Sequence, residues 1–245
     1  MVLLAATLLV APSTLFAQDA DAYLEKLLNM YDAPFSANYG MSMSMNQGGM
    51  TMSMDGTGSM TYRDETHMVM NMELNMTMPG TDQGMAMNVR TVSDGTTSWT
   101  EMDNPMMGKQ VIKMDIARAK EMSGQGVNAN AGSSPIEQLR TLQAYYDFTV
   151  AGKSGGSVTL AGTIKDDAPA SIKQGGPMVE TMTVVLNESN GQLQRFELGP
   201  AGDPAMVMTM NDYRVLSASD VPDSMFDYAP PAGVTVIDPL AMSQQ

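Results

Sequence analysis

The sequence predicts a mainly β fold with a few helices: an incomplete antiparallel β-barrel, or half-barrel, whose concave face is covered by helices. Three observations predict it. Methionine recurs at every second position in several segments, turn residues separate those segments, and helical patterns occur in two distant regions. Because side chains of a strand alternate between two faces, each methionine run points to one side of a sheet. The helices are too few for ordinary α+β packing, so a curled sheet should hold them in its concavity.

The first half of the chain begins with a helix and continues in strands. A helical apolar stripe predicts a helix over Asp19–Ala33, and Pro34 ends it. Turn sequences such as Pro79-Gly80 separate the strands that follow, and Asp94-Gly95 is a hairpin signal. The predicted strands are Phe35–Asn46, Met50–Tyr62, Glu65–Met78, Gly84–Ser93, Thr96–Met102 and Lys109–Met114.

A helical interlude precedes the second set of strands. Ile116–Met122 is a short predicted helix, and Ser134-Pro135-Ile136-Glu137 is a capping box that starts another. Ile136, Leu139 and Leu142 form the apolar face of this second helix, which we expect to act as a lid over the cavity. Further strands are predicted at Asp147–Ala151, Ser157–Lys165, Val179–Asn187, Gln192–Leu198 and Met206–Ser217.

The methionine face is the candidate site. Half of the 28 methionines lie between Met41 and Met87, and small polar residues such as Ser42 and Asn71 alternate with them. Thioether side chains repack easily around flexible apolar guests. We predict a lipid-binding cavity lined by Met41, Met43, Met45, Met50, Met52, Met54, Met68, Met70, Met72, Leu74, Met76, Met85, Met87, Trp99, Met206, Met208 and Met210.

Composition restricts the function classes. A formal net charge of −14 disfavours nucleic acid and anionic membrane surfaces as partners. The absence of cysteine excludes disulfides, thiolate metal sites and a cysteine nucleophile. We expect one domain over residues 18–245, a monomer, and no cofactor.

The N-terminal residues have the character of an export signal. Val2–Val10 is a short apolar run, too short to span a bilayer, and Leu15-Phe16-Ala17 ends in a small residue. We predict a signal peptide over residues 1–17, cleaved after Ala17, and a soluble exported protein.

Catalysis is not predicted. Gly152-Lys153-Ser154-Gly155-Gly156 matches the G-x-S-x-G pattern, but it is expected to join two strands, whereas a nucleophile elbow joins a strand to a helix. His67 is the single histidine and is expected on a distant strand. The acidic residues form no paired constellation in the sequence.

Three segments resemble the outer-membrane lipoprotein carrier family (LolA-like): the tail Phe226–Asp238, the hairpin Ser93–Trp99 and the segment Asn190–Phe196. The resemblance implies a half-barrel with a helical lid and a periplasmic carrier of lipoprotein acyl chains or lipids. It also implies an inner-membrane releasing complex and an outer-membrane acceptor as partners. Arg63 falls on a family arginine that bonds to the lid and helps to hold it shut, and Asp64 stands where the family has proline.

Other interpretations of the methionines remain open. They can be plain core, since buried methionine usually fills gaps, although a core so rich in it would be loosely specified. They can also bind Cu(I) or Ag(I), because soft thioethers select such ions, and a methionine-rich periplasmic Cu(I)/Ag(I)-binding protein is the alternative function. A sacrificial oxidant sink would need exposed methionines.

Overall fold

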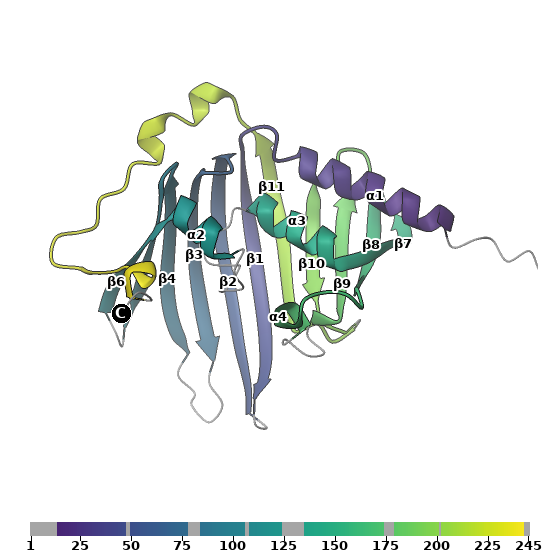
Figure 1. Ribbon diagram of the computed structural model, residues 1–245, viewed down its shortest axis with the longest axis horizontal. Coiled ribbons are helices and arrows are strands. Elements are labelled where there is room, and N and C mark those ends of the chain that lie inside the picture. Colours follow the sequence, from purple (N-terminus) through teal and green to yellow (C-terminus); the bar gives the residue numbers. More distant parts are fainter. Residues whose placement is uncertain are drawn as a thin grey trace, which may run out of the picture.

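The structure, a computed structural model, describes residues 14–47, 50–77, 84–105, 108–123, 135–173, 179–200 and 202–242. These residues form a 12-stranded sheet in the order β12-β6-β5-β4-β3-β2-β1-β11-β10-β9-β8-β7, open at both ends (Figure 1). Neighbouring strands are antiparallel, except that β12 runs parallel to β6. The prediction of an incomplete antiparallel barrel with helices is therefore confirmed.

The strands match the sequence pattern closely. They are β1 (Phe35–Gln47), β2 (Met50–Asp64), β3 (His67–Thr77), β4 (Met85–Asp94), β5 (Thr97–Asn104), β6 (Gly108–Asp115), β7 (Tyr146–Ser154), β8 (Ser157–Ile164), β9 (Thr181–Asn187), β10 (Leu193–Leu198), β11 (Met206–Val215) and β12 (Thr235–Ile237). β12 has only three residues and was not predicted. β3 begins at His67, two residues later than expected, because the Asp64 carboxylate accepts hydrogen bonds from the backbone N–H groups of Thr66 and His67 and forms a turn there.

The helices are α1 (Thr14–Asn29), α2 (Ile116–Ser123), α3 (Pro135–Tyr145), α4 (Ala170–Lys173) and α5 (Pro239–Met242). The expected helix at Asp19–Ala33 is thus shifted toward the N-terminus, and the turn Met30–Asp32 follows it. The predicted cleavage point after Ala17 lies within α1, and residues 1–13 lie outside the described part of the chain. Ser134 of the expected capping box also lies outside it. Among the described helices, none is long and apolar enough to span a bilayer.

The hydrophobic core lies between α1, α3 and one half of the sheet. α1 contributes Leu24 and Leu27, α3 contributes Ile136, and strands β7–β10 contribute residues such as Leu160 and Leu186, all below 9% exposed. Figure 1 shows α1 and α3 lying across the strands of this half, whereas α2 lies in front of the other half. We call the part of the sheet formed by β7–β10 the closed half.

The chain after β11 crosses to the opposite face of the sheet. This segment, residues 216–234, contains two short 3-10 helices, η2 (Ala218–Asp220) and η3 (Asp223–Met225), and leads into β12 at the far edge (Figure 1). We call it the C-terminal strap. Val221 and Phe226 anchor it, since each is only 1% exposed. The strap therefore packs firmly against this face of the sheet through these two side chains.

Candidate apolar binding surface

The strand register brings methionines from distant parts of the chain into one line. Residues directly opposite in an antiparallel pair share a face of the sheet. Met43 of β1 pairs with Met206 of β11 on one side and with Met54 of β2 on the other. Met54 pairs with Met76 of β3, and Met76 pairs with Met85 of β4. These five residues, which we call the five-methionine row, cross five adjacent strands without interruption.

Neighbouring rows place most of the other predicted residues on the same face. One row joins Met208, Met41, Gly56, Leu74 and Met87, and the next joins Met210, Tyr39, Gly58, Met72 and Val89. Toward the start of β1, Met60 pairs with Met70, and Tyr62 with Met68. Toward its end, Met45 pairs with Met52, and Gln47 with Met50. The register therefore brings the predicted methionines and Leu74 together as one apolar surface.

Burial falls along this surface with distance from the core. Met60 and Met210 are 7% and 5% exposed and belong to the core cluster. Met68, Met70, Met72, Met206 and Met208 are half-buried and pack against that cluster. Farther out, Met41, Met43, Met52, Met54, Met76, Met85 and Met87 are half-buried and lie outside it. Plain core packing therefore accounts for only some of these side chains.

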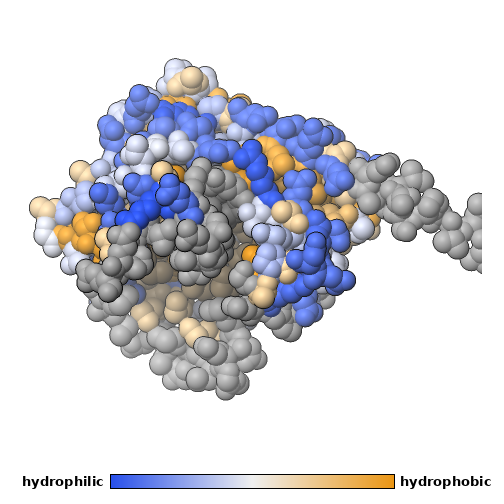
Figure 2. All heavy atoms as spheres, in the orientation of Figure 1, coloured by the Kyte–Doolittle hydropathy of each residue, from blue (hydrophilic) through white to orange (hydrophobic). Residues whose placement is uncertain are grey.

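Alternation of exposure confirms that the two faces differ. In β3 and β4 the methionines are half-buried, whereas Asn71, Glu73, Asn75 and Asn88 between them are exposed. Figure 2 shows the helix-bearing face hollowed between the surfaces of α2 and α3, and described residues visible on the floor of the hollow have the colour of apolar residues. We call the outer part of this face, carried by β11 and β1–β4, the thioether face.

The helical lid covers the closed half more than the thioether face. Ile136 is 4% exposed, and Leu139 and Leu142 pack against the core. Leu139 and Leu142 also line a small cavity of about 20 Å³, shared with Leu24, Leu27 and Leu28 of α1 and with Phe148, Met182, Val184 and Phe196 of the sheet. The expectation that these residues cover a methionine cavity is therefore corrected: the described lining around Leu139 and Leu142 comes from α1 and from β7, β9 and β10, and Met182 is the single methionine in it.

Trp99 does not belong to the thioether face. It pairs with Val92 of β4 and Lys113 of β6, while the adjacent Thr100 pairs with Thr91, which lies opposite Met70. A shift of one residue changes the face of the sheet. Trp99 therefore packs on the strap side, where its ring lies 5.6 Å from that of Tyr228. The placement of Trp99 in the cavity was wrong because single-residue register cannot be read from one tryptophan.

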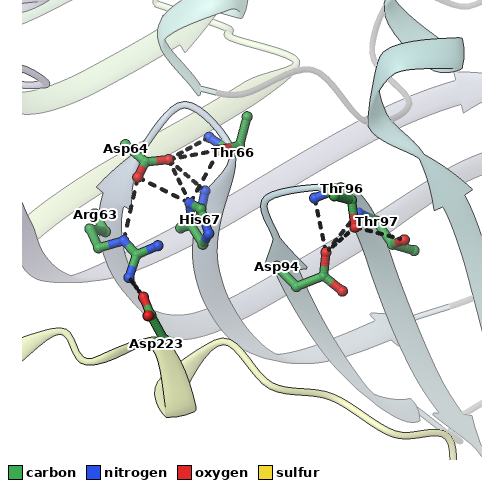
Figure 3. A network of polar contacts seen from close by, with 8 residues as sticks. All are labelled: Arg63, Asp64, Thr66, His67, Asp94, Thr96, Thr97 and Asp223. Atoms are coloured by element: carbon green, nitrogen blue, oxygen red, sulfur yellow. Dashed lines mark hydrogen bonds and ion pairs between the residues drawn. The ribbon is translucent and has the colours of Figure 1, made fainter.

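Arg63 is also on the strap side. Its guanidinium forms ion pairs with Asp223 of the strap at 2.5 Å and with Asp64 at 3.4 Å (Figure 3). It also lies 4.7 Å from the Phe226 ring. These described contacts hold the strap. The expectation that Arg63 bonds to the lid is therefore corrected: its described partners outside β2 are Asp223 and Phe226 of the strap. A charged residue of the lid, Arg140 of α3, reaches the sheet: its guanidinium lies 2.8 Å from Glu65 in the β2–β3 turn.

The same turn holds the single histidine. His67 Nδ1 lies 2.9 Å from an Asp64 carboxylate oxygen (Figure 3). The His67 ring packs edge-on against Phe226. Burial alone would raise the pKa of Asp64, but hydrogen bonds from His67 and Thr66 outweigh it and lower the pKa to about 2. His67 thus has a structural partner in Asp64. The G-x-S-x-G match, residues 152–156, lies at the β7–β8 hairpin, and several strands separate it from His67 of β3 in the sheet.

The opposite face carries an open depression of about 860 Å³ across β11 and β1–β6. Its side chains are mainly amides, hydroxyls and charged groups, including Asn38, Thr57, Asn71, Asn88 and Arg90. Acyl chains would bury these groups without hydrogen-bond partners, at a cost in free energy. Although this depression is larger than the cavity beneath the lid, its chemistry does not suit an apolar guest.

Comparison with known proteins yields similarity in structure only. No protein-family model matches the sequence, and no curated protein matches it. The chain is similar to an uncharacterized conserved protein from Thermus thermophilus, with 9% identity, a TM-score of 0.46, and coverage of 89% of this chain and 98% of that one. It is similar to LprF from Mycobacterium bovis, with 14% identity, a TM-score of 0.45, and coverage of 83% and 94%.

A third similar structure is a LolA superfamily protein from Nitrosomonas europaea, with 14% identity, a TM-score of 0.30, and coverage of 85% of this chain and 97% of that one. At these identities and TM-scores the function of those proteins does not transfer to this chain. Its function is inferred below from its own residues.

Proposed function

We propose that this protein is a periplasmic carrier that binds the acyl chains of lipids or lipoproteins on its thioether face, for transfer toward the outer membrane. The observation that carries the proposal is the outward continuation of the apolar surface beyond the core. Met54, Met76 and Met85 share one face in direct register and are half-buried, outside the core cluster. Large apolar surfaces of this kind mark binding sites.

Thioether side chains suit a guest of variable length and shape. Methionine is unbranched, has three rotatable bonds and repacks with little strain. Each methylene of an acyl chain removed from water contributes about 0.8 kcal/mol, so two or three chains bind strongly without a charged anchor. The polar groups of the opposite face offer no such gain.

Release requires a cover that opens at low cost. α3 is continuous with β7, and Lys165 Nζ donates a hydrogen bond to the carbonyl of Ala144 at the C-terminal end of the helix, at 2.9 Å. The Arg140–Glu65 pair is exposed, at 54% and 40% of the two side chains, so it contributes little to closure.

Transfer between membranes would need a donor and an acceptor. The net charge of −14 is unsuited to direct docking on an anionic leaflet, which favours handover through partner proteins. A releasing complex in the inner membrane and an acceptor at the outer membrane are the partners that the sequence resemblance implies.

A binding assay with paired variants tests the proposal. A fluorescent fatty acid is titrated into the full-length protein after delipidation, and native mass spectrometry records any lipid that co-purifies from a Gram-negative host. The variant Met54→Asn/Met76→Asn introduces polar groups into directly paired positions of the thioether face. We expect at least a tenfold loss of affinity, since each buried amide without a partner costs about 1–3 kcal/mol.

The matched control is Ser53→Asn/Thr77→Asn. These two residues are also directly paired between β2 and β3, one position away and on the opposite face. This control should bind the fatty acid as the wild type does. Equal losses in the two double variants, or a wild-type protein that neither retains lipid nor binds the probe, would exclude the acyl-carrier function.

A further inference from the structure

The five-methionine row has a second chemical capacity that does not depend on lipid binding. It consists of Met206, Met43, Met54, Met76 and Met85, each directly paired with the next across adjacent antiparallel strands. The three central residues each have a methionine on both sides. No other described row of the sheet contains so long an uninterrupted run of thioethers.

Strand geometry allows the sulfur atoms of this row to converge. Directly opposed residues of an antiparallel pair have Cβ atoms about 4.5–5.5 Å apart. A methionine side chain has three rotatable bonds beyond Cα, so its sulfur can move toward either neighbouring strand. Met43 and Met76 lie on the two sides of Met54, and both can therefore bring their sulfur atoms to a common ion beside it.

Ligand chemistry selects the kind of ion. Thioethers are soft, neutral ligands and favour Cu(I) over hard or borderline divalent ions. Among the described residues, no group of three or more histidine, cysteine, aspartate or glutamate side chains is placed to hold a metal. A monovalent ion bound only by neutral sulfur keeps its positive charge, and the net charge of −14 of the chain favours the approach of such a cation.

The surroundings of the row also fit an ion that enters from water. Met43, Met54, Met76, Met85 and Met206 are all half-buried, so their sulfur atoms are partly withdrawn from solvent without being enclosed in the core. By contrast, Met60 and Met210 are at most 7% exposed and belong to the core cluster. The row therefore belongs to the accessible part of the methionine surface.

We propose that the five-methionine row is a binding site for Cu(I) or its congener Ag(I), centred on Met43, Met54 and Met76, with Met206 and Met85 extending it. The ion is held as a monovalent cation, with no change of oxidation state. Acyl chains and the ion would occupy the same face, so each should weaken the binding of the other.

Removing sulfur while keeping the surface apolar tests this site. Full-length protein is titrated anaerobically with Cu(I) against bicinchoninate, and with Ag(I) in a parallel calorimetric titration. The wild type should take at least one Cu(I) per chain from the competitor. Met54→Leu/Met76→Leu should lower the affinity for both ions at least tenfold, because leucine keeps the volume and apolarity of the surface and removes only the sulfur atoms.

The matched control removes as many sulfur atoms from the same face. Met102 of β5 pairs with Val89 and Gln110, and Met114 of β6 pairs with Ser98, so neither has a methionine directly opposite. Met102→Leu/Met114→Leu should bind both ions like the wild type. An equal loss in both double variants, or a wild type that leaves all Cu(I) with bicinchoninate, would overturn the proposal. Fatty-acid binding is measured in a separate titration, so failure of the ion site and failure of the acyl-carrier function can be distinguished.

Discussion

Two glycines of β2 determine how side chains lie on the inner face of the sheet. A Cβ atom added at Gly58 would come within 2.5 Å of the Tyr39 hydroxyl, which donates a hydrogen bond to the Asn71 carbonyl at 3.1 Å. A Cβ atom at Gly56 would lie 2.6 Å from Leu74 Cδ2. Both glycines thus leave room for a neighbouring side chain to lie across β2. This explains why Leu74 is only 8% exposed while the methionines beside it are half-buried.

Gly58→Ala should destabilise the protein by about 1–3 kcal/mol, the usual cost of inserting a methyl group where there is no space. The loss would be measured as a lower free energy of unfolding in urea. Gly152→Ala in β7 is the control, because a Cβ atom there would meet nothing within 4 Å. That variant should differ from the wild type by less than about 0.5 kcal/mol. A tolerated alanine at position 58 would contradict the described packing of Tyr39.

At the scale of elements, the two arginines near the end of β2 serve different segments. Arg63 belongs to the sheet and holds the C-terminal strap through Asp223 and Phe226. Arg140 belongs to α3 and reaches Glu65 in the β2–β3 turn. The strap and the lid therefore contact the end of β2 and the following turn from opposite faces: the strap through Asp223, which pairs with Arg63 of the sheet, and the lid through Arg140.

Arg63→Leu should loosen the strap and leave the lid unchanged. Loss of the ion pair and of the contact with the Phe226 ring costs about 0.5–1 kcal/mol, so amide hydrogen exchange over residues 218–226 should accelerate a few-fold. Exchange within α3 should not change. In the companion variant Arg140→Gln the pattern should reverse, with a small acceleration in α3 only. Faster exchange of α3 in Arg63→Leu would restore the role in lid closure that the family resemblance implied.

The whole molecule divides into two parts with different packing. In the closed half, α1 and α3 bury branched and aromatic side chains such as Leu160 and Phe196. The thioether face continues the same inner surface across β11 and β1–β4, where methionines are half-buried. One sheet thus combines a conventional core with an apolar surface that is available to a guest.

Mild peroxide treatment should distinguish these parts. Met54, Met76 and Met85 should form sulfoxides well before Met60, Met182 and Met210, which are 7%, 2% and 5% exposed. Peptide mass spectrometry over a time course would give the order of oxidation. Saturation with a fatty acid should slow oxidation of the first group and leave the second group unaffected. Uniform oxidation rates would show that the thioether face is packed like the core.

Much of the architecture follows from local patterns. The two-residue period of the methionines identified β1–β4 and β11 and their inner face, because side-chain direction in a strand depends only on position along it. Turn residues placed the breaks, and all six predicted strands before α2 occur in the structure. The common face of the methionines within each strand could likewise be read from the sequence alone.

Tertiary structure decided which strands meet and what covers them. Met206 and Met43 lie far apart in the sequence, and only the pairing of β11 with β1 joins them in the five-methionine row. The tertiary structure also determined on which face of the sheet Trp99 and Arg63 lie, and where the strap and β12 pack. The physical reason is that periodicity depends on the chain's own geometry, whereas register, lid position and the partner of a charge depend on contacts between segments remote in sequence.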